Sequence, residues 1–239
     1  MKIFWIILIL VVAYAAIEAG VFLYKKTHLP DLKTPDQSEK SFGNGSSIRY
    51  IAAGDSTAVG IGATSLETTY PYQVAAFLAK GHVVDYKNIA VGGYTTKDVL
   101  EKQVQDIIEF KPDIVTISMG GNDATHLILE SHIIANYKSV ISQLEKQTSA
   151  KIYITDIPHF NGARLLPWFY ISLLEFRSGY INPKLLALSD GRTKIVNIHD
   201  FGWADYPDLQ LTYSADHFHP NDTGYANWAK AFLDSIQKP

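Results

Sequence analysis

Three side chains in this sequence are of the types that together catalyse acyl transfer: a hydroxyl, an imidazole and a carboxylate. Ser56 lies in a Gly-Asp-Ser-Thr segment, and Asp216 precedes His219 by three residues, so this carboxylate can turn onto the same imidazole. In such a set the imidazole takes the hydroxyl proton while the carboxylate orients the ring. The sequence therefore predicts Ser56 as the nucleophile, His219 as the general base and Asp216 as its orienting acid.

Acyl transfer also needs hydrogen-bond donors for the negative charge that develops on the carbonyl oxygen. The predicted donors of this oxyanion hole are the backbone N–H groups of Ser56 and Gly93 and the side-chain amide of Asn122. Two alternatives stay open: Gly92 leaves a one-residue ambiguity beside Gly93, and Asn122 also suits a helix cap. We expect Asp55 to shape the turn or to cap the following segment.

Other residues compete for the roles of base and orienting acid. His219 precedes Pro220, which favours an extended backbone leading into a helix, whereas His217 lacks that constraint and is expected to be a solvated loop residue. Asp200 is a substitute orienting acid in a loop. Asp123 is expected to be an orienter or a local cap.

These segments resemble the GDSL esterase/lipase family, also called SGNH hydrolases. The four residues of that second name match here in order as Ser56, Gly93, Asn122 and His219. The family's Asp-x-x-His pair falls on Asp216 and His219, and the resemblance covers about residues 50–228. It implies a flavodoxin-like three-layer α/β/α sandwich with a central, mostly parallel sheet, metal-independent hydrolysis and broad ester or thioester substrates. An α/β-hydrolase is excluded, since the chain contains no Gly-x-Ser-x-Gly nucleophile elbow.

The elements that must position these residues follow an α/β pattern. Short β-branched runs alternate with amphipathic stretches, which is typical of a mostly parallel sheet covered by helices. We expect strands at 48–53, 83–89, 113–118, 151–155 and 194–198. We expect helices at 71–80, 95–110, 133–147 and 222–236. Ligands bind at the carboxyl ends of such strands, where Ser56, Gly93 and Asn122 follow three of them, and Asp216 and His219 precede the last helix.

The stretch 161–189 is too long for a simple connection between a helix and a strand. We expect a helical insertion over the site. Within it, the sequence Trp168-Phe169-Tyr170 favours buried packing over a lid that touches a membrane, and a role in an acyl pocket stays open.

The N-terminal segment is almost entirely apolar. Residues 3–24 would span roughly 30 Å as a helix, enough for a hydrocarbon layer, and only Glu18 interrupts them. We expect one transmembrane helix as an anchor over 1–26, a flexible tether over 27–47 and a hydrolase domain over 48–239. The alternative is a signal peptide cleaved near Ala15, with a secreted product. We expect the catalytic domain on the extracytoplasmic side.

Composition excludes several function classes. The 239 residues carry a net charge of −3 with dispersed basic residues, which argues against a nucleic-acid partner. The chain has no cysteine, so disulfides, thiolate metal sites and a cysteine nucleophile are excluded. The remaining histidines show no metal-ligand spacing, so neither a metal nor another cofactor is expected.

The expected partner is a small-molecule, lipid or glycan acyl ester. The sequence leaves the oligomeric state undetermined. An O-acetyl esterase or acyltransferase that acts on cell-envelope glycans would use the same residues with a different substrate or acceptor. The non-enzymatic alternative is a catalytically silent lipid- or glycan-binding module. Such a module is expected to lack at least one of the four family residues, whereas all four are present here.

Overall fold

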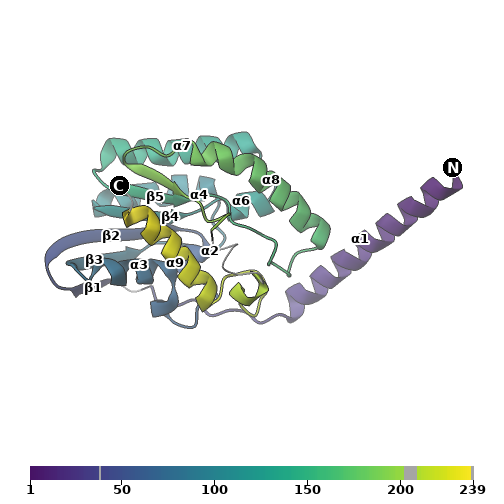
Figure 1. Cartoon of the computed structure of the whole chain (residues 1–239), viewed down its shortest axis with the longest axis horizontal. Helices are drawn as coiled ribbons and strands as arrows, with labels where there is room; N and C mark the ends of the chain where they lie inside the picture. The colour runs from purple at the N-terminus through teal and green to yellow at the C-terminus, as the bar shows by residue number, and fades with distance from the viewer. Residues whose placement is uncertain (38, 202–208, 238–239) are drawn as a thin grey trace.

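A single six-stranded sheet forms the centre of the catalytic domain in the computed structural model, which describes residues 1–37, 39–201 and 209–237 (Figure 1). Residues 38, 202–208 and 238–239, which belong to the predicted tether and hydrolase domain, lie outside the described residues. The strands are β1 (Lys40–Gly43), β2 (Ser46–Gly54), β3 (His82–Asn88), β4 (Ile114–Ser118), β5 (Lys151–Thr155) and β6 (Thr193–Val196).

The strand order confirms the predicted fold class. Along the sheet the strands lie β1-β3-β2-β4-β5-β6, and every neighbouring pair is parallel except β1 with β3. The five parallel strands, counted along the chain, therefore have the order 2-1-3-4-5 of the flavodoxin-like fold. The strand order reverses between β2 and β4, and ligands of such folds bind outside the carboxyl ends of the strands at this point.

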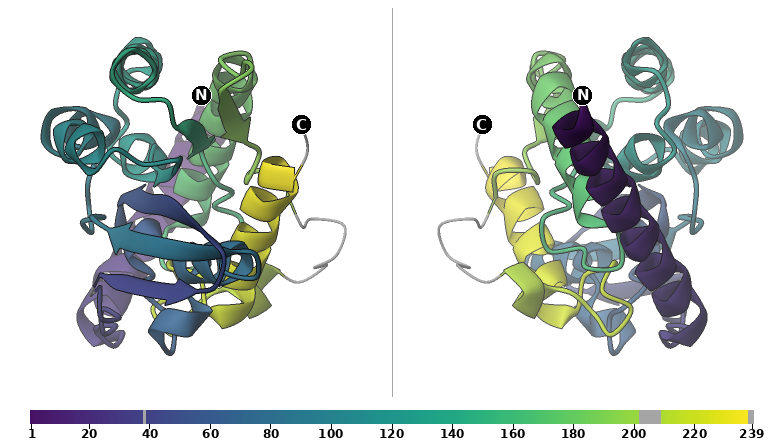
Figure 2. Two further views of the ribbon diagram at one scale, coloured as in Figure 1. Left: turned by 90° about the vertical axis from the view of Figure 1, so that its left-hand side faces the viewer. Right: turned by 90° about the vertical axis from the view of Figure 1, so that its right-hand side faces the viewer.

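Helices cover both faces of the sheet (Figure 2). The helices of the described residues are α1 (Lys2–His28), which lies apart from the sheet, and α2 (Ser56–Val59), α3 (Tyr70–Leu78), α4 (Thr96–Lys102), α5 (Val104–Phe110), α6 (Gly121–Thr125), α7 (Glu130–Gln147), α8 (Trp168–Leu186) and α9 (Asp222–Gln237), with 3₁₀ turns at Leu66–Thr68 and Leu209–Thr212. Alternate β2 residues face opposite sides: Ile51 packs with α4, α5, α7 and α8, whereas Tyr50 packs with α3 and α9. The result is the predicted three-layer sandwich.

The structured domain begins earlier than the sequence predicts. β1 lies inside the predicted tether, and β2 starts at Ser46, two residues before the predicted strand. Phe42 of β1 stacks on Tyr72 of α3 with ring centroids 5.4 Å apart. The glycine- and serine-rich composition of this stretch hid an edge strand that depends on its partner β3 and on this aromatic contact.

The predicted single helix over 95–110 is two helices. α4 ends at Lys102 and α5 begins at Val104, with Gln103 between them at φ −117° and ψ −29°. Helical periodicity continues across the break, so the sequence pattern does not reveal it. The side chain of Gln103 bonds to the backbone beside the nucleophile instead, as described below.

The N-terminal helix α1 projects away from the domain (Figure 1). None of its 27 residues is buried, and its length and apolar composition are sufficient to cross a membrane. A signal sequence has the same properties. Its last turn carries Lys25, Lys26 and His28.

The predicted helical insertion contains α8, and here the expectation of buried packing is wrong for two residues. Trp168 and Phe169 are 66% and 44% exposed. Both lie exposed in the first turn of the helix, whereas Ile171 and Leu174 enter the core. Tyr170 is half-buried, and its hydroxyl donates to the Thr125 carbonyl at 2.5 Å.

Candidate active site

A glycine turn ends β2 immediately before Ser56. Gly54 has φ +122°, and a Cβ added there would lie 1.9 Å from the Ser118 carbonyl oxygen of β4. Only glycine allows this backbone angle together with so close an approach. The Asp55 N–H donates to the same carbonyl at 3.0 Å, so the turn is fixed to β4 and delivers Ser56 to the start of α2.

Ser56, His219 and Asp216 form one hydrogen-bonded chain. Ser56 Oγ lies 3.0 Å from His219 Nε2, and His219 Nδ1 lies 2.5 Å from Asp216 Oδ2. With a proton on Nδ1 donated to the carboxylate, Nε2 carries the lone pair that accepts the serine proton. The three residues predicted as nucleophile, base and orienting acid thus lie together, although 163 positions separate the first two.

The carboxylate of Asp216 is itself held in place. Its Oδ1 accepts hydrogen bonds from Ser214 Oγ, the Phe218 N–H and the His219 N–H at 2.8, 2.9 and 3.0 Å. Burial alone would raise the pKa of Asp216, but the His219 imidazole and the two N–H donors outweigh it and lower the pKa to about 2. Asp216 is therefore ionised at neutral pH and can stabilise an imidazolium.

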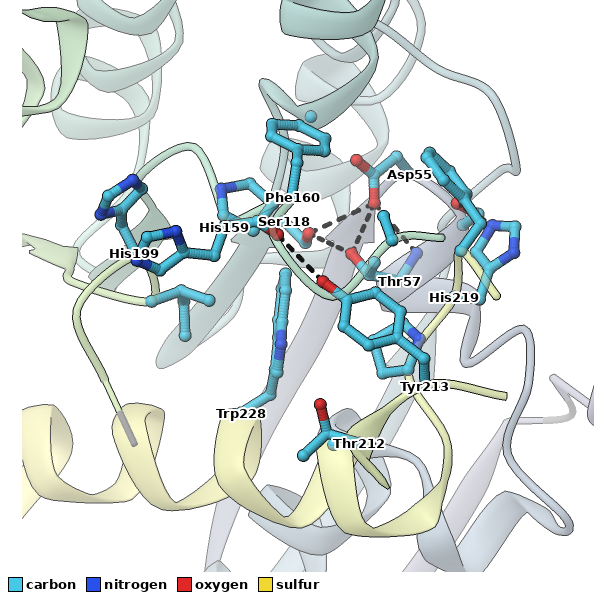
Figure 3. A pocket seen from close by; sticks show the side chains of 18 of the residues that line it. Asp55, Thr57, Ser118, His159, Phe160, His199, Thr212, Tyr213, His219 and Trp228 are labelled. Atoms are coloured by element: carbon cyan, nitrogen blue, oxygen red, sulfur yellow. Dashed lines mark hydrogen bonds between the residues drawn. The ribbon is translucent and has the colours of Figure 1, made fainter. Parts of the chain in front are cut away.

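Asp55 forms its hydrogen bonds around the turn that carries Ser56, and not with His219. Its Oδ1 accepts from the Thr57 N–H at 3.0 Å, from Thr57 Oγ1 at 2.6 Å and from Ser118 Oγ at 3.2 Å, and the two hydroxyls also bond to each other (Figure 3). Burial raises the pKa of Asp55 despite these donors. The predicted role of Asp55 in shaping the turn and capping α2 agrees with these contacts.

Gln103 is a positioning residue that the sequence did not reveal. Its Oε1 accepts from the Gly54 N–H at 2.8 Å, and its Nε2 donates to the carbonyls of Gly54 and Ile89, each at 3.1 Å. The buried amide thus ties the end of β2 to the loop after β3. The signal for this role in the sequence was that Gln103 is a polar residue on the apolar side of the predicted helix 95–110.

Two of the predicted oxyanion donors are the Ser56 N–H and the side-chain amide of Asn122. The Ser56 N–H opens α2, so no preceding turn of that helix accepts from it. Asn122 donates through Nδ2 to the Tyr94 carbonyl at 2.9 Å, which fixes the amide and leaves a second N–H to donate. Because the cap residue of α6 is Gly120, the alternative role of Asn122 as a helix cap is wrong.

Gly93 lies in the loop after β3 with φ +82°. A Cβ added at Gly93 would meet nothing within 4 Å, whereas one at Gly92 would lie 3.8 Å from the Cβ of Ser56. The backbone angle therefore explains the glycine at 93, whereas the space around Gly92 would accept a Cβ in ordinary van der Waals contact. The choice of Gly93 as the donor stays a prediction.

The competing residues have other partners. Asp200 Oδ1 lies 3.0 Å from His199 Nδ1, and Asp123 accepts from the Thr96 N–H and hydroxyl at 2.8 and 2.6 Å, which caps the start of α4. His217 is exposed in a turn at φ 56°. Asp216 is thus the acid that bonds to His219.

An open cleft runs from Ser56 between the ends of β4, β5 and β6 and the start of α9 (Figure 3). Much of its wall is apolar, formed by Met119, Pro158, Phe160, Ala163, Ile198, Phe201, Phe218 and Trp228. Ser56, Asn122 and His219 line the same cleft. A group bound there would therefore have an apolar portion beside the reactive hydroxyl.

Three further titratable residues meet at the far wall of this cleft. His159 Nδ1 lies 2.6 Å and His199 Nε2 lies 3.6 Å from Glu175 Oε2, while Glu175 Oε1 accepts from the Phe160 N–H at 2.5 Å. Burial alone would raise the pKa of Glu175, but the two histidines and this N–H lower it to about 2. Burial alone would lower the pKa of His199, but Glu175 and Asp200 raise it. We call this group the His-Glu-His clamp.

The ligand atoms of the His-Glu-His clamp lie within 4.8 Å of one another, so these residues are the candidates for holding a metal ion. The two imidazole rings are stacked, with centroids 3.7 Å apart and 25° between their planes. Stacked rings direct their nitrogens side by side instead of around a tetrahedron. As arranged, the clamp links α8 to the loop after β5 by the His159 hydrogen bond and to the loop after β6 by the longer His199 contact. No spacing in the sequence predicts it.

Comparison with known proteins agrees with this fold and shows the family. The model of the GDSL-like lipase/acylhydrolase family matches residues 52–226, so the chain belongs to that family. It is accordingly a serine hydrolase of ester bonds.

Individual relatives are distant. Protein YpmR of Bacillus subtilis (strain 168), described as uncharacterized, is 26% identical over an alignment of 185 residues that covers 65% of this chain and 67% of YpmR. The lipase Lip_vut3 from a goat rumen metagenome has a TM-score of 0.62 at 21% identity, over 79% of this chain and 97% of that one. A catalytic mutant of Axe2, an acetylxylan esterase from Geobacillus stearothermophilus, has a TM-score of 0.58 at 18% identity, over 82% and 97%. These structures share the fold.

Proposed function

We propose that the chain hydrolyses carboxylic acyl esters through a Ser56-His219-Asp216 triad and an acyl-enzyme. The observation that carries this proposal is the continuous hydrogen-bonded chain of 3.0 and 2.5 Å that starts at a serine in an open cleft. Ionised Asp216 keeps the Nδ1 proton on His219 and stabilises the charge that the ring acquires.

The proposed reaction has two halves. His219 Nε2 takes the proton of Ser56 as Oγ attacks the ester carbonyl, and the oxyanion accepts hydrogen bonds from the N–H groups of Ser56 and Gly93 and from Asn122. Each donor is worth roughly 3 kcal/mol in the transition state. His219 then returns the proton to the leaving alcohol. In the second half, water loses a proton to His219, attacks the acyl-enzyme, and Ser56 recovers its proton as the acid leaves.

The cleft wall favours an acyl group with apolar length over an acetyl group. Apolar side chains dominate the surface beside Ser56, and burying each methylene of a substrate chain is worth about 0.8 kcal/mol. An O-acetyl esterase or acyltransferase acting on glycans would use the same three residues, so the products must distinguish them.

We further propose that α1 remains attached and anchors the chain in a membrane, with the catalytic domain on the extracytoplasmic side. Three features of α1 support an anchor: a full spanning length, the absence of buried residues and basic residues in its last turn. An N-terminal apolar helix, cleaved or retained, is also the element that directs export.

The test uses the full-length chain in detergent. A fluorophosphonate probe should label the wild type and fail to label Ser56→Ala, and Ser56→Ala should lose at least 10³-fold in turnover of an aryl ester. Ser235→Ala is the matched control, since its hydroxyl bonds only within α9. Labelling or full activity retained in Ser56→Ala would refute the triad.

A second set of measurements identifies the reaction. Short-chain, long-chain and acetylated-sugar esters are compared, and the products are determined by mass spectrometry. Free acid from the longer chains is expected. Faster turnover of acetylated sugars, or acyl groups appearing on an acceptor alcohol, would replace this proposal with the glycan esterase or transferase.

A further inference from the structure

Helix α8 is apolar on two opposite sides. One side enters the core through Ile171, Leu174, Ile181 and Leu185. The other side exposes large apolar residues, namely Trp168, Phe169, Leu173, Phe176 and Tyr180. At about 100° per residue, the exposed set occupies a sector of roughly 140° that faces away from the buried set. We call the exposed set the outer face of α8.

The outer face carries no charge within α8. The remaining residues of its sector are small or uncharged: Ser172, Gly179 and Pro183. The charged residues of the helix lie outside the sector: Glu175 bonds in the His-Glu-His clamp, Arg177 donates to the Ile128 carbonyl, and Lys184 pairs with Glu130. Lys184 Nζ also lies 3.6 Å from the ring centroid of Tyr180, at the C-terminal edge of the outer face. Phe176, at the centre of the face, is 76% exposed. A contiguous apolar and aromatic stripe of this kind, with a charge only at its Tyr180 edge, marks a binding surface.

The start of α8 lies against the base of α1. The Trp168 N–H donates to Glu18 Oε2 at 3.3 Å, and Lys25 Nζ donates to the Arg164 carbonyl at 2.6 Å. Glu18, which alone interrupts the apolar run of α1, thus accepts from one of the N–H groups that a helix start leaves unpaired. α8 then crosses the direction of α1 instead of following it, on the side of the domain from which α1 projects (Figure 1).

We propose that the outer face of α8 lies in the interfacial layer of the same bilayer that α1 spans. A helix that crosses a membrane-spanning helix near its end runs along the membrane surface. Trp and Tyr favour that depth, and the basic residues beside the contact, Lys25 and Arg164, suit anionic lipid headgroups. This contact of α8 with the bilayer requires that α1 stays attached, as proposed above, and it does not depend on the hydrolytic reaction.

The contact would connect the membrane to the cleft. Glu175 lies on α8 between Leu173 and Phe176, and it bonds to His159, which lines the cleft that contains Ser56. The wall of the cleft is therefore less than one helical turn from the outer face. This arrangement deepens the proposed function, since it assigns acyl esters embedded in the bilayer as the substrate class.

The first experiment measures the contact itself. The chain contains no cysteine, so Phe176→Cys in the full-length protein can carry a single environment-sensitive fluorophore. In vesicles of phosphatidylcholine and phosphatidylglycerol, brominated acyl chains should reduce its fluorescence at least twofold. The control carries the same label at Gln105→Cys, an exposed position of α5 in the full-length chain, and its fluorescence should not change. Equal quenching at both positions would overturn the proposal, as would self-quenching at Phe176→Cys that grows with protein density and indicates a second copy.

The second experiment separates this contact from catalysis. The double variant Trp168→Ser, Phe176→Ser should lose about tenfold in turnover of a long-chain ester held in vesicles and stay within twofold on a soluble short-chain ester. Equal turnover of the vesicle substrate would refute the delivery of substrate from the bilayer. If the wild type hydrolyses neither ester, the proposed reaction fails, while the quenching result still decides the membrane contact.

Discussion

The two walls of the cleft are held by different kinds of bonds. The wall that carries Ser56 is fixed mainly by backbone contacts at Gly54 and by the neutral amide of Gln103, with one carboxyl group, Asp55, in the turn. The opposite wall is attached to α8 through ionisable side chains, chiefly the His-Glu-His clamp. Backbone contacts respond little to pH, whereas the clamp depends on the charge of its members. The reactive wall is therefore built for fixed geometry, and the opposite wall for an adjustable fit.

The largest effect is expected at the orienting acid. Asp216→Asn should lower kcat about 10³- to 10⁴-fold, because a neutral amide no longer holds the proton on His219 Nδ1. Steady-state kinetics of the purified chain measure it. The matched control is Asp200→Asn, whose carboxylate bonds to His199 and Asn197 instead. A comparable loss in both variants would show that Asp216 has no special role.

The next effect concerns a buried acid under the clamp. Asp156 Oδ1 accepts from the Ile198 and His199 N–H groups, and burial raises the pKa of Asp156 to about 7 even though these donors lower it. The folded state thus keeps this proton up to higher pH than the unfolded chain. Stability from this group is present below about pH 4 and is lost as the pH rises to about 7.

Asp156→Asn should remove that loss. The difference in unfolding free energy between wild type and variant should change by about 4 kcal/mol between pH 4 and pH 8, in favour of the variant at pH 8. Urea unfolding across this range measures it. Parallel stability curves for the two proteins would contradict the assignment.

Gln103→Leu tests the wall that carries Ser56. It leaves the buried N–H of Gly54 and the carbonyl of Ile89 without the Gln103 amide, while the Gly54 carbonyl keeps the Val91 N–H, and we expect a loss of about 3 kcal/mol in unfolding free energy. The loss should be nearly the same from pH 6 to pH 8, as the comparison of the walls requires. Gln105→Leu, on the exposed side of α5, is the control and should change stability by less than about 0.5 kcal/mol.

The smallest effect is expected from Glu175→Gln in the opposite wall. Neutralising the clamp should raise KM for a long-chain ester about fivefold, or roughly 1 kcal/mol, while kcat on a short-chain ester stays within threefold. The KM change should also flatten the dependence of long-chain binding on pH. Glu130→Gln, which breaks only the surface pair with Lys184, serves as the control. A fall in kcat that equals the rise in KM would assign Glu175 to the reactive wall.

Most of the fold was predictable because its signals are local. The β-branched runs identify five strands, and their alternation with helices implies a parallel sheet. The missed features depend on distant partners: β1 forms only against β3, and the helix breaks at Gln103 because its side chain bonds to Gly54 and Ile89. Neither partner can be read from neighbouring residues.

The active site likewise has one part that the sequence motif predicts and one part that depends on distant partners. The motif predicts Ser56, His219 and Asp216, and the structure adds their distances. The catalytic roles stay predictions until the variants are measured. The clamp was missed because 16 and 24 positions separate Glu175 from His159 and His199, without helical or metal-ligand spacing. The ends of β5 and β6 were the available signal, since His159 and His199 each follow one of them.

The distance along the chain between Ser56 and its base also has a consequence for biosynthesis. The ribosome completes His219 163 residues after Ser56, which takes about 10 to 30 s at the usual rates of synthesis. During that interval the hydroxyl has no base beside it and is an ordinary alcohol. On the proposed mechanism, the nascent chain is therefore inert towards the lipids and esters that it passes, and hydrolysis begins only when α9 has docked and the domain is complete.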